Sequence, residues 1–260
     1  RLESTAQVPP LALLPMYAAL SPEMQSRVFQ DAPDGVRRCI VSTNIAETSL
    51  TLDGVRYVID SGFSKIKVYS SRTGIDALQV YPISQASARQ RAGRAGRSAP
   101  GTCYRLYTHA AFDQDMLASS IPEALRTNLA NVALLLKTHK VHDIASFEFI
   151  DTPSKSAIDA ACAQLWLLGA LDDLGNLSLL GNLMAQLPLE PHVSRLLIAA
   201  EQLKCVDDAL VLAAMLSAPR VFFRSRERSR ESDEAHARFT HPGSDHITLI
   251  NVFKQWIGHN

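Results

Sequence analysis

The chain has few cysteines, no long apolar run and no net charge, and each of these absences excludes a class of protein. The four cysteines form no C-x-x-C pair, so we expect neither a zinc site nor a disulfide framework. No apolar stretch approaches the ~18–20 residues that cross a bilayer, and residues 1–10 lack the apolar core of a signal peptide. We therefore expect a protein of a reducing intracellular compartment that is neither membrane-bound nor secreted.

Charge is balanced overall but unevenly distributed. The formal net charge is +0 over 260 residues, so a site for nucleic acid or another anion must be a local patch. The segment from Ser84 to Phe112 provides one, because it contains five arginines and no acidic residue. Hydrophobic residues make up 47% of the chain, enough for one large domain or two to three small ones.

The first ~108 residues alternate short apolar runs with helical patches, a pattern typical of a parallel sheet covered by helices. We predict strands at residues 11–17, 37–42, 55–60 and 101–108, of which 37–42 and 55–60 are apolar enough to be buried in the sheet. Ser21 and Pro22 start a helix that runs toward Phe29. Residues 65–80 predict a projecting β-hairpin.

Helical periodicity replaces the strands after Thr108. Apolar residues at helical spacing predict helices within 121–139 and 154–171, followed by a small hairpin that closes on Gly175. Helices followed by such a hairpin describe a winged helix, and residues 180–260 predict a separate helical bundle. We therefore predict an α/β lobe with a parallel sheet at 1–108, an all-α winged helix at 109–179 and a helical bundle at 180–260. Trp166 and Trp256 have apolar neighbours at helical spacing, which favours core packing over base stacking.

The segment "QRAGRAGR", Gln90 to Arg97, is the strongest chemical signal. Its arginines recur every third residue, at Arg91, Arg94 and Arg97. In a helical segment they share one face, and the two glycines between them let the backbone approach a ligand. Planar guanidinium groups suit phosphate oxygens, and three of them without a nearby acid would repel one another unless an anion lay among them. A solvated basic helix, the alternative, does not need paired glycines.

A second segment, "STNIAETSLT" from Ser42 to Thr51, directly follows the predicted strand 37–42. Small hydroxyl and amide side chains at the carboxyl end of a strand lie where α/β sheets place ligands, and they can hold a phosphate. Taken alone, such a segment is usually only a loop. The arginine segment favours the interpretation as a ligand site.

These segments and their order resemble the second RecA-like lobe of DEAH-box ATP-dependent RNA helicases, followed by the winged-helix and ratchet domains of that family. The resemblance is strongest to the nuclear pre-mRNA-splicing group, and in detail to the member that remodels the spliceosome for the second step. Ser61 in "VIDSG", where many splicing relatives have proline, points there. A DEAH-box helicase of ribosome assembly or of antiviral defence is an alternative, and so is a non-enzymatic module that binds RNA or protein.

The resemblance implies catalytic roles in "QRAGRAGR", which matches the family's motif VI. Arg94 and Arg97 would be arginine fingers on the γ-phosphate of ATP, and Gln90 would orient the attacking water or its phosphate. Arg91 would be a further contact to the nucleotide.

The resemblance also implies roles for residues before the hairpin. "STNIAETSLT" matches motif V, in which Ser42 would sense the γ-phosphate. The RNA-facing residues would be Thr43, Asn44 and Thr48. Asp60 would lie near the ribose or phosphates, and Phe29 would either stack on the adenine or belong to the core.

The sequence contains no G-x-x-x-x-G-K-[ST] phosphate loop. The resemblance therefore implies that ATP and Mg²⁺ are bound mainly by a first lobe outside this sequence, and that this piece alone is inactive. No metal ligands are expected within it. Single-stranded RNA, spliceosomal proteins and a G-patch-type activator are the implied partners, in the nucleus. The letters DEAH themselves occur at Asp233 to His236, where no strand precedes them, so we interpret them as a solvated loop and helix face.

Overall fold

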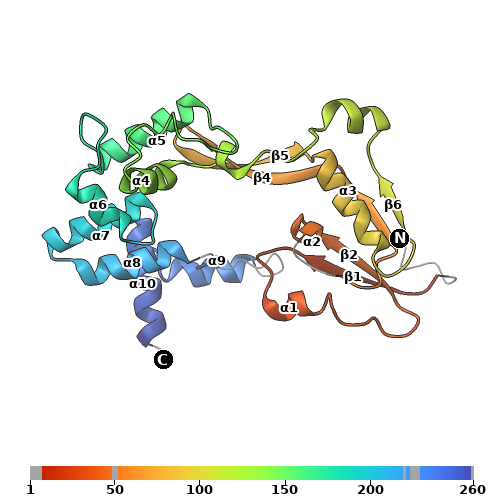
Figure 1. Ribbon diagram of the computed structural model, residues 1–260. Coiled ribbons are helices and arrows are strands. Elements are labelled where there is room, and N and C mark those ends of the chain that lie inside the picture. The colour runs from red at the N-terminus through yellow and green to blue at the C-terminus, as the bar shows by residue number, and fades with distance from the viewer. Residues whose placement is uncertain (1–7, 49–51, 219–220, 223–228, 259–260) are drawn as a thin grey trace. The chain divides into compact units, whose positions relative to one another are not determined.

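The computed structural model describes residues 8–48, 52–218, 221–222 and 229–258 (Figure 1). The chain divides into two compact units, residues 1–127 and 128–260. The first unit contains all six strands that the described residues form, and the second contains helices with one isolated β-bridge. The predicted change from an α/β lobe to helical domains is therefore confirmed, and the first unit extends beyond Thr108.

Parallel pairing in the first unit follows the predicted strands. β1 (Leu11–Met16) pairs in parallel with β2 (Arg37–Ser42), and β3 (Tyr57–Asp60) pairs in parallel with β6 (Thr102–Arg105). The prediction that residues 37–42 and 55–60 are buried strands is wrong, since Ile59 is 72% exposed and neither strand is buried throughout. In β3 the exposed Tyr57 and Ile59 alternate with Val58 and the buried Asp60, because successive side chains of a strand point to opposite faces.

Short helices with polar caps connect the strands. α1 (Pro22–Ser26) begins at Ser21, whose Oγ accepts a hydrogen bond from the Met24 N–H. It ends before Phe29, and Val28 is the side chain that enters the core with Met16. α2 (Ile45–Thr48) follows β2. α3 (Gln85–Gly93) begins at Ser84, whose Oγ accepts a hydrogen bond from the Ser87 N–H. A 3₁₀ turn, η1 (Arg94–Gly96), continues α3.

The predicted hairpin is present as two antiparallel strands, β4 (Phe63–Ser70) and β5 (Ile75–Pro82). Gly74 has a φ of 69° at the turn, a conformation that glycine adopts without strain. The Lys67 ammonium contacts the Asp76 carboxylate across the strands at 2.8 Å. Arg126 holds the outer edge of β4, because its carbonyl accepts from the Tyr69 N–H at 2.8 Å and its Nη1 donates to the Lys67 carbonyl at 3.3 Å.

Two further turns complete the first unit. η2 (Ala111–Asp115) is a π-helical turn, and η3 (Glu123–Leu125) is a 3₁₀ turn. Met116, which follows η2, packs with Ile83 and Ala88 of the segment that starts α3. This cluster holds α3 in place beside the chain that leaves β6.

The second unit begins with the helices α4 (Ala130–Thr138), α5 (Lys155–Leu167) and α6 (Leu179–Ala185). The predicted small hairpin between α5 and α6 is a single antiparallel bridge, Leu171 to Leu177, and Gly175 turns it with a φ of 76°. In this turn the Asp172 carboxylate accepts hydrogen bonds from backbone N–H groups. The bond from the Asn176 N–H contributes most to lowering the pKa of Asp172 below its usual value. The core formed by these helices and the segments that join them buries Leu129, Ala130, Ala133, Leu134, Ile144, Ile158, Ala161, Leu165, Ala170, Leu171 and Met184.

Four helices follow in the second unit: α7 (Pro191–Leu203), α8 (Val206–Ser217), α9 (Ser229–Ala237) and α10 (Asp245–Gly258). α8 contacts both α7 and α10, as expected for the predicted helical bundle. The string Asp233 to His236 lies in α9 and not at the end of a strand, so its interpretation as a helix is confirmed. Within the described ranges, none of the helices has both the length and the apolar character that a bilayer crossing requires.

Candidate functional site

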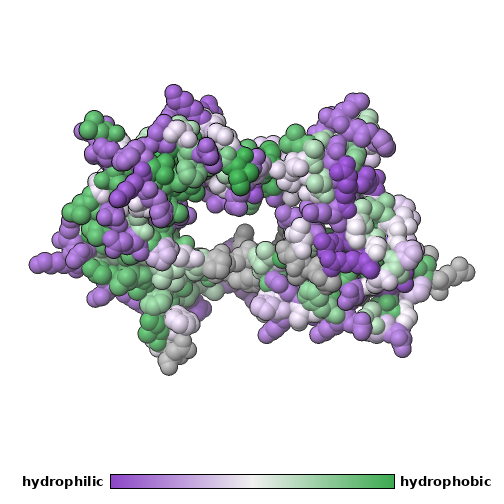
Figure 2. All heavy atoms as spheres, in the orientation of Figure 1, coloured by the Kyte–Doolittle hydropathy of each residue, from purple (hydrophilic) through white to green (hydrophobic). Residues whose placement is uncertain are grey.

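The arginine segment spans the end of α3 and the 3₁₀ turn η1. Arg91 lies in the last turn of α3, Arg94 opens η1, and Arg97 follows it. The predicted helical geometry is therefore present, with a change from α-helix to 3₁₀ at Arg94. Arg94 is partly buried, and Gln90 and Arg97 are exposed. Figure 2 shows a strongly hydrophilic surface over α3.

The two glycines of this segment lie against open space. A Cβ atom added at Gly93 or Gly96 would meet no other atom within 4 Å. Neither glycine has a positive φ, so neither is required for its backbone conformation. Open space beside the backbone is what the close approach of a ligand requires.

Arg91 lies between two carboxylates instead of facing an open anion site. Its Nη1 donates to Asp60 Oδ1 at 2.8 Å, and its Nε donates to Glu47 Oε2 at 3.0 Å. The exposed fractions of the side chains are 16% for Arg91, 0% for Asp60 and 11% for Glu47. The expectation of an arginine cluster without a nearby acid is therefore wrong for Arg91, because the fold brings both acids from distant parts of the sequence.

Asp60 uses both carboxylate oxygens within the protein. Besides Arg91, Oδ1 accepts from the Gly62 N–H at 3.0 Å, and Oδ2 accepts from the Tyr107 hydroxyl at 2.9 Å. Burial and the hydrogen bond to Asp60 raise the pKa of Tyr107 to about 12. The sequence predicts a nucleotide contact for Asp60, whereas the structure places its side chain in a buried network.

Glu47 and Tyr107 were not among the predicted site residues. Glu47 had a usable signal, because it is the sole acid between Ser42 and Thr51 and an arginine that leaves solvent requires an anionic partner. Tyr107 had no such signal. Its hydroxyl reaches Asp60 because β6 pairs with β3 in parallel, which brings two segments distant in sequence together.

The motif V segment begins at the last residue of β2 and includes α2. Ser42 is the last residue of β2, and its hydroxyl donates to the Thr43 carbonyl at 2.8 Å. Thr43 and Asn44 are exposed just before α2, and Thr48 is exposed at its end. Residues 49–51 of the predicted segment lie outside the described residues. α2 contacts α3, so the structure brings the two motifs together.

The remaining arginines of the basic patch surround an aromatic ring. The Arg105 guanidinium carbon lies 4.5 Å from the Phe112 ring centroid, and that of Arg89 lies 5.8 Å from it. The five arginines thus divide into a pair at Phe112, an ion-paired Arg91, and Arg94 and Arg97 in the turn after α3. Phe29, the predicted adenine contact or core residue, is half exposed and therefore not a core residue.

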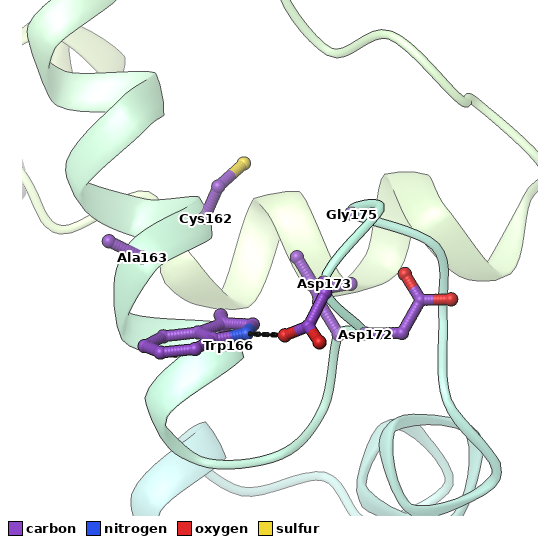
Figure 3. A pocket seen from close by; sticks show the side chains of 7 residues that line it. Cys162, Ala163, Trp166, Asp172, Asp173 and Gly175 are labelled. Atoms are coloured by element: carbon purple, nitrogen blue, oxygen red, sulfur yellow. Dashed lines mark hydrogen bonds between the residues drawn. The ribbon is translucent and has the colours of Figure 1, made fainter.

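Trp166 lines a shallow depression of about 410 Å³ in the second unit (Figure 3). The prediction that Trp166 and Trp256 pack in the core is wrong, since both side chains are at least half exposed. The Trp166 indole N–H donates to the Asp173 carboxylate at 2.9 Å, so the ring needs no buried partner. Two aspartates, Asp172 and Asp173, line the depression beside the ring, and their negative charge disfavours an RNA phosphate there.

Three consecutive parts of the chain match families of helicase domains. Residues 4–99 match the helicase conserved C-terminal domain. Residues 163–189 match the winged-helix part of the helicase associated domain HA2, and residues 190–249 match its ratchet-like part. The predicted order of a RecA-like lobe, a winged helix and a ratchet domain is confirmed.

The chain is also similar along nearly its whole length to a characterised helicase. It is 49% identical over 249 residues to "Pre-mRNA-splicing factor ATP-dependent RNA helicase prp22" of Schizosaccharomyces pombe. The match covers 96% of this chain and 21% of the relative, so the chain spans about a fifth of that protein's length. The three domain matches and this similarity show that the chain contains a helicase conserved C-terminal domain followed by a helicase associated domain HA2.

Proposed function

We propose that the chain is the C-terminal helicase region of an ATP-dependent RNA helicase that couples ATP hydrolysis to the remodelling of RNA–protein complexes in pre-mRNA splicing. One observation carries this proposal: α3 and η1 present Arg94 and Arg97 beside the motif V helix α2. The name of the 49% identical relative, a pre-mRNA-splicing ATP-dependent RNA helicase, supports the choice of reaction and process.

In the proposed reaction, Arg94 and Arg97 contact the γ-phosphate and stabilise the negative charge that develops on its oxygens. Gln90, exposed on α3, orients the attacking water. Ser42 at the end of β2 senses the γ-phosphate. The half-exposed Phe29 ring stacks on the adenine.

RNA binds to the motif V side of the lobe in this proposal. Thr43, Asn44 and Thr48 are exposed at the two ends of α2. Small hydroxyl and amide groups of this kind suit hydrogen bonds to the RNA backbone. We therefore assign single-stranded RNA to this edge.

The donors available in this chain fit part of an ATP–Mg²⁺ complex. Arginine guanidinium groups match triphosphate oxygens, and the open space beside Gly93 and Gly96 admits a phosphate close to the backbone. Among the described residues, no group of three His, Cys, Asp or Glu side chains could hold a metal ion. We therefore propose that the Mg²⁺ ligands come from the part of the helicase that precedes this sequence. When bound, ATP supplies the phosphoryl group whose transfer to water drives remodelling.

The name of the same relative, a pre-mRNA-splicing factor, supports a setting in splicing. We propose that the protein acts in the nucleus with spliceosomal proteins, and that a G-patch-type activator stimulates it. The balanced net charge is consistent with local contacts to such partners instead of a general attraction to RNA.

The test is the hydrolysis step in the full-length helicase. We expect Arg94→Ala or Arg97→Ala to lower the turnover number for RNA-stimulated ATP hydrolysis by ~10³ while nucleotide affinity changes much less. Arg94→Lys should not restore turnover, because an ammonium cannot reproduce the planar guanidinium fork. Affinity measured with a fluorescent ATP analogue is the second readout. Equal losses of affinity and turnover would show instead an anion clamp that holds the ground state.

A further inference from the structure

Arg91 joins three segments that must be in register for the proposed reaction. α3, which carries Arg91, continues into the turn that carries Arg94. α2, which carries Glu47, lies between the proposed RNA contacts at its two ends. β3 ends at Asp60. A single guanidinium group therefore connects the nucleotide-facing turn with the RNA-facing helix and with the sheet.

The geometry of this connection requires an arginine. The Arg91 side chain donates three hydrogen bonds: to Asp60 at 2.8 Å, to Glu47 at 3.0 Å and to the Phe63 carbonyl at 3.3 Å. The two carboxylates accept from different nitrogens of the planar Arg91 guanidinium. These two bonds fix both the distance and the rotation of α3 relative to α2. A lysine ammonium keeps the charge but cannot reproduce this fork.

Burial indicates that the network is internal and does not face a ligand. Burial disfavours the charged guanidinium, but the hydrogen bonds from Arg91 to Asp60 and Glu47 outweigh it and raise the pKa of Arg91. Both oxygens of Asp60 already accept from protein donors. A nucleotide would have to break these bonds to reach either group, and leaving a buried charge without its partner is costly.

We infer that Arg91, Glu47 and Asp60 are positioning residues, which hold Arg94 and Arg97 in their productive orientation and transmit RNA binding at motif V to them. This inference rests on the proposed function. Asp60 anchors Arg91 to β3, and Glu47 links it to the RNA-facing helix. Loss of the Glu47 link should therefore reduce the stimulation by RNA more than the hydrolysis without RNA.

The experiment compares variants of the full-length helicase in ATP hydrolysis with and without single-stranded RNA. Glu47→Gln is nearly isosteric and removes the charge of one partner. Arg91→Lys keeps the charge and loses the fork. Arg230→Lys is the matched control, because Arg230 forms an exposed ion pair with Glu234 in the second unit, outside the network.

We expect Glu47→Gln and Arg91→Lys each to lower the RNA-stimulated turnover number by about 10–100-fold, the scale of an ångström-sized misplacement of catalytic groups. The KM for ATP should stay within about threefold, because ground-state binding is not removed. The double variant with Glu47→Gln and Arg91→Lys should be no slower than Arg91→Lys alone, since both changes break the same contact between Arg91 and Glu47. Arg230→Lys should match the unmodified protein.

Several results would overturn the inference. A rise in the KM for ATP in step with the loss of turnover would make Arg91 a nucleotide ligand. Losses that multiply in the double variant, or unchanged RNA stimulation in Glu47→Gln, would show that no link exists. If a smaller active fraction and a lower Tm account for the loss of turnover, Arg91 and its partners have only a structural role. If Arg94→Ala also leaves turnover unchanged, the proposed function itself fails, which distinguishes the two cases.

Discussion

Two leucines of α5 provide a sharp test of where the core of the second unit lies. Leu165 is 0% exposed and belongs to the core cluster, whereas Leu167, two positions later, is 76% exposed. Both are in the same helix and lose the same atoms when replaced by alanine. The difference between Leu165→Ala and Leu167→Ala therefore isolates burial from helix propensity.

The expected magnitudes follow from burial. Leu165→Ala removes buried methyl groups and leaves a cavity, which costs about 2–5 kcal/mol of unfolding free energy. Leu167→Ala removes mostly hydrated surface and should change that free energy by no more than about 0.5 kcal/mol. With a urea dependence of about 1–3 kcal/mol per molar, the Leu165→Ala midpoint should fall by roughly 1–2 M.

Tryptophan fluorescence is the appropriate assay. The chain has 2 tryptophans, and both Trp166 and Trp256 lie in the second unit, so their emission during urea denaturation follows this unit. Circular dichroism would follow the whole chain in parallel. Equal midpoint shifts for the two variants, or a loss below about 1 kcal/mol for Leu165→Ala, would refute this assignment of the core.

Three further predictions concern activity and titration. The 260-residue chain alone should not hydrolyse ATP with RNA, because it contains no phosphate loop; turnover above background in the purified chain would contradict this. Replacing Tyr69 to Leu78 with a short Gly-Ser turn in the full-length helicase should leave ATP hydrolysis largely intact but severely reduce duplex unwinding, since the hairpin is separate from α3; unwinding that stays in proportion to ATP turnover would refute a coupling role. The raised pKa of Tyr107, about 12, predicts a stabilising contribution that is fully present below pH ~10 and is lost as the pH rises from ~10 through about 12. Absorbance at ~295 nm should show this late titration, and Tyr107→Phe should remove it.

The sequence predicts local structure well where the signal lies within a few residues. The strand at residues 37–42 matches β2, and the predicted cap at Ser21 starts a helix through a side-chain bond to a nearby backbone N–H group. The hairpin at 65–80 is a continuous pattern with its glycine at the turn. These features depend on neighbouring residues, so periodicity and turn chemistry are sufficient to find them.

Solvent exposure could not be predicted in the same way. The apolar strand 55–60 indicates burial, yet Ile59 is 72% exposed. Trp166 has apolar neighbours at helical spacing, yet its ring is at the surface with its N–H bonded to Asp173. An apolar pattern shows which face of an element can be buried, whereas the surrounding elements decide whether that face is covered.

The sequence by itself was enough to predict a phosphate-binding segment at Gln90 to Arg97, because arginine spacing and the intervening glycines are local properties. Only the tertiary structure decided which of those arginines is ion-paired inside the protein. Arg91 meets Glu47 and Asp60, which are 44 and 31 residues away along the chain. Such contacts form when β-strand pairing and helix packing bring remote segments together, and they satisfy the charge of an arginine that would otherwise repel its neighbours.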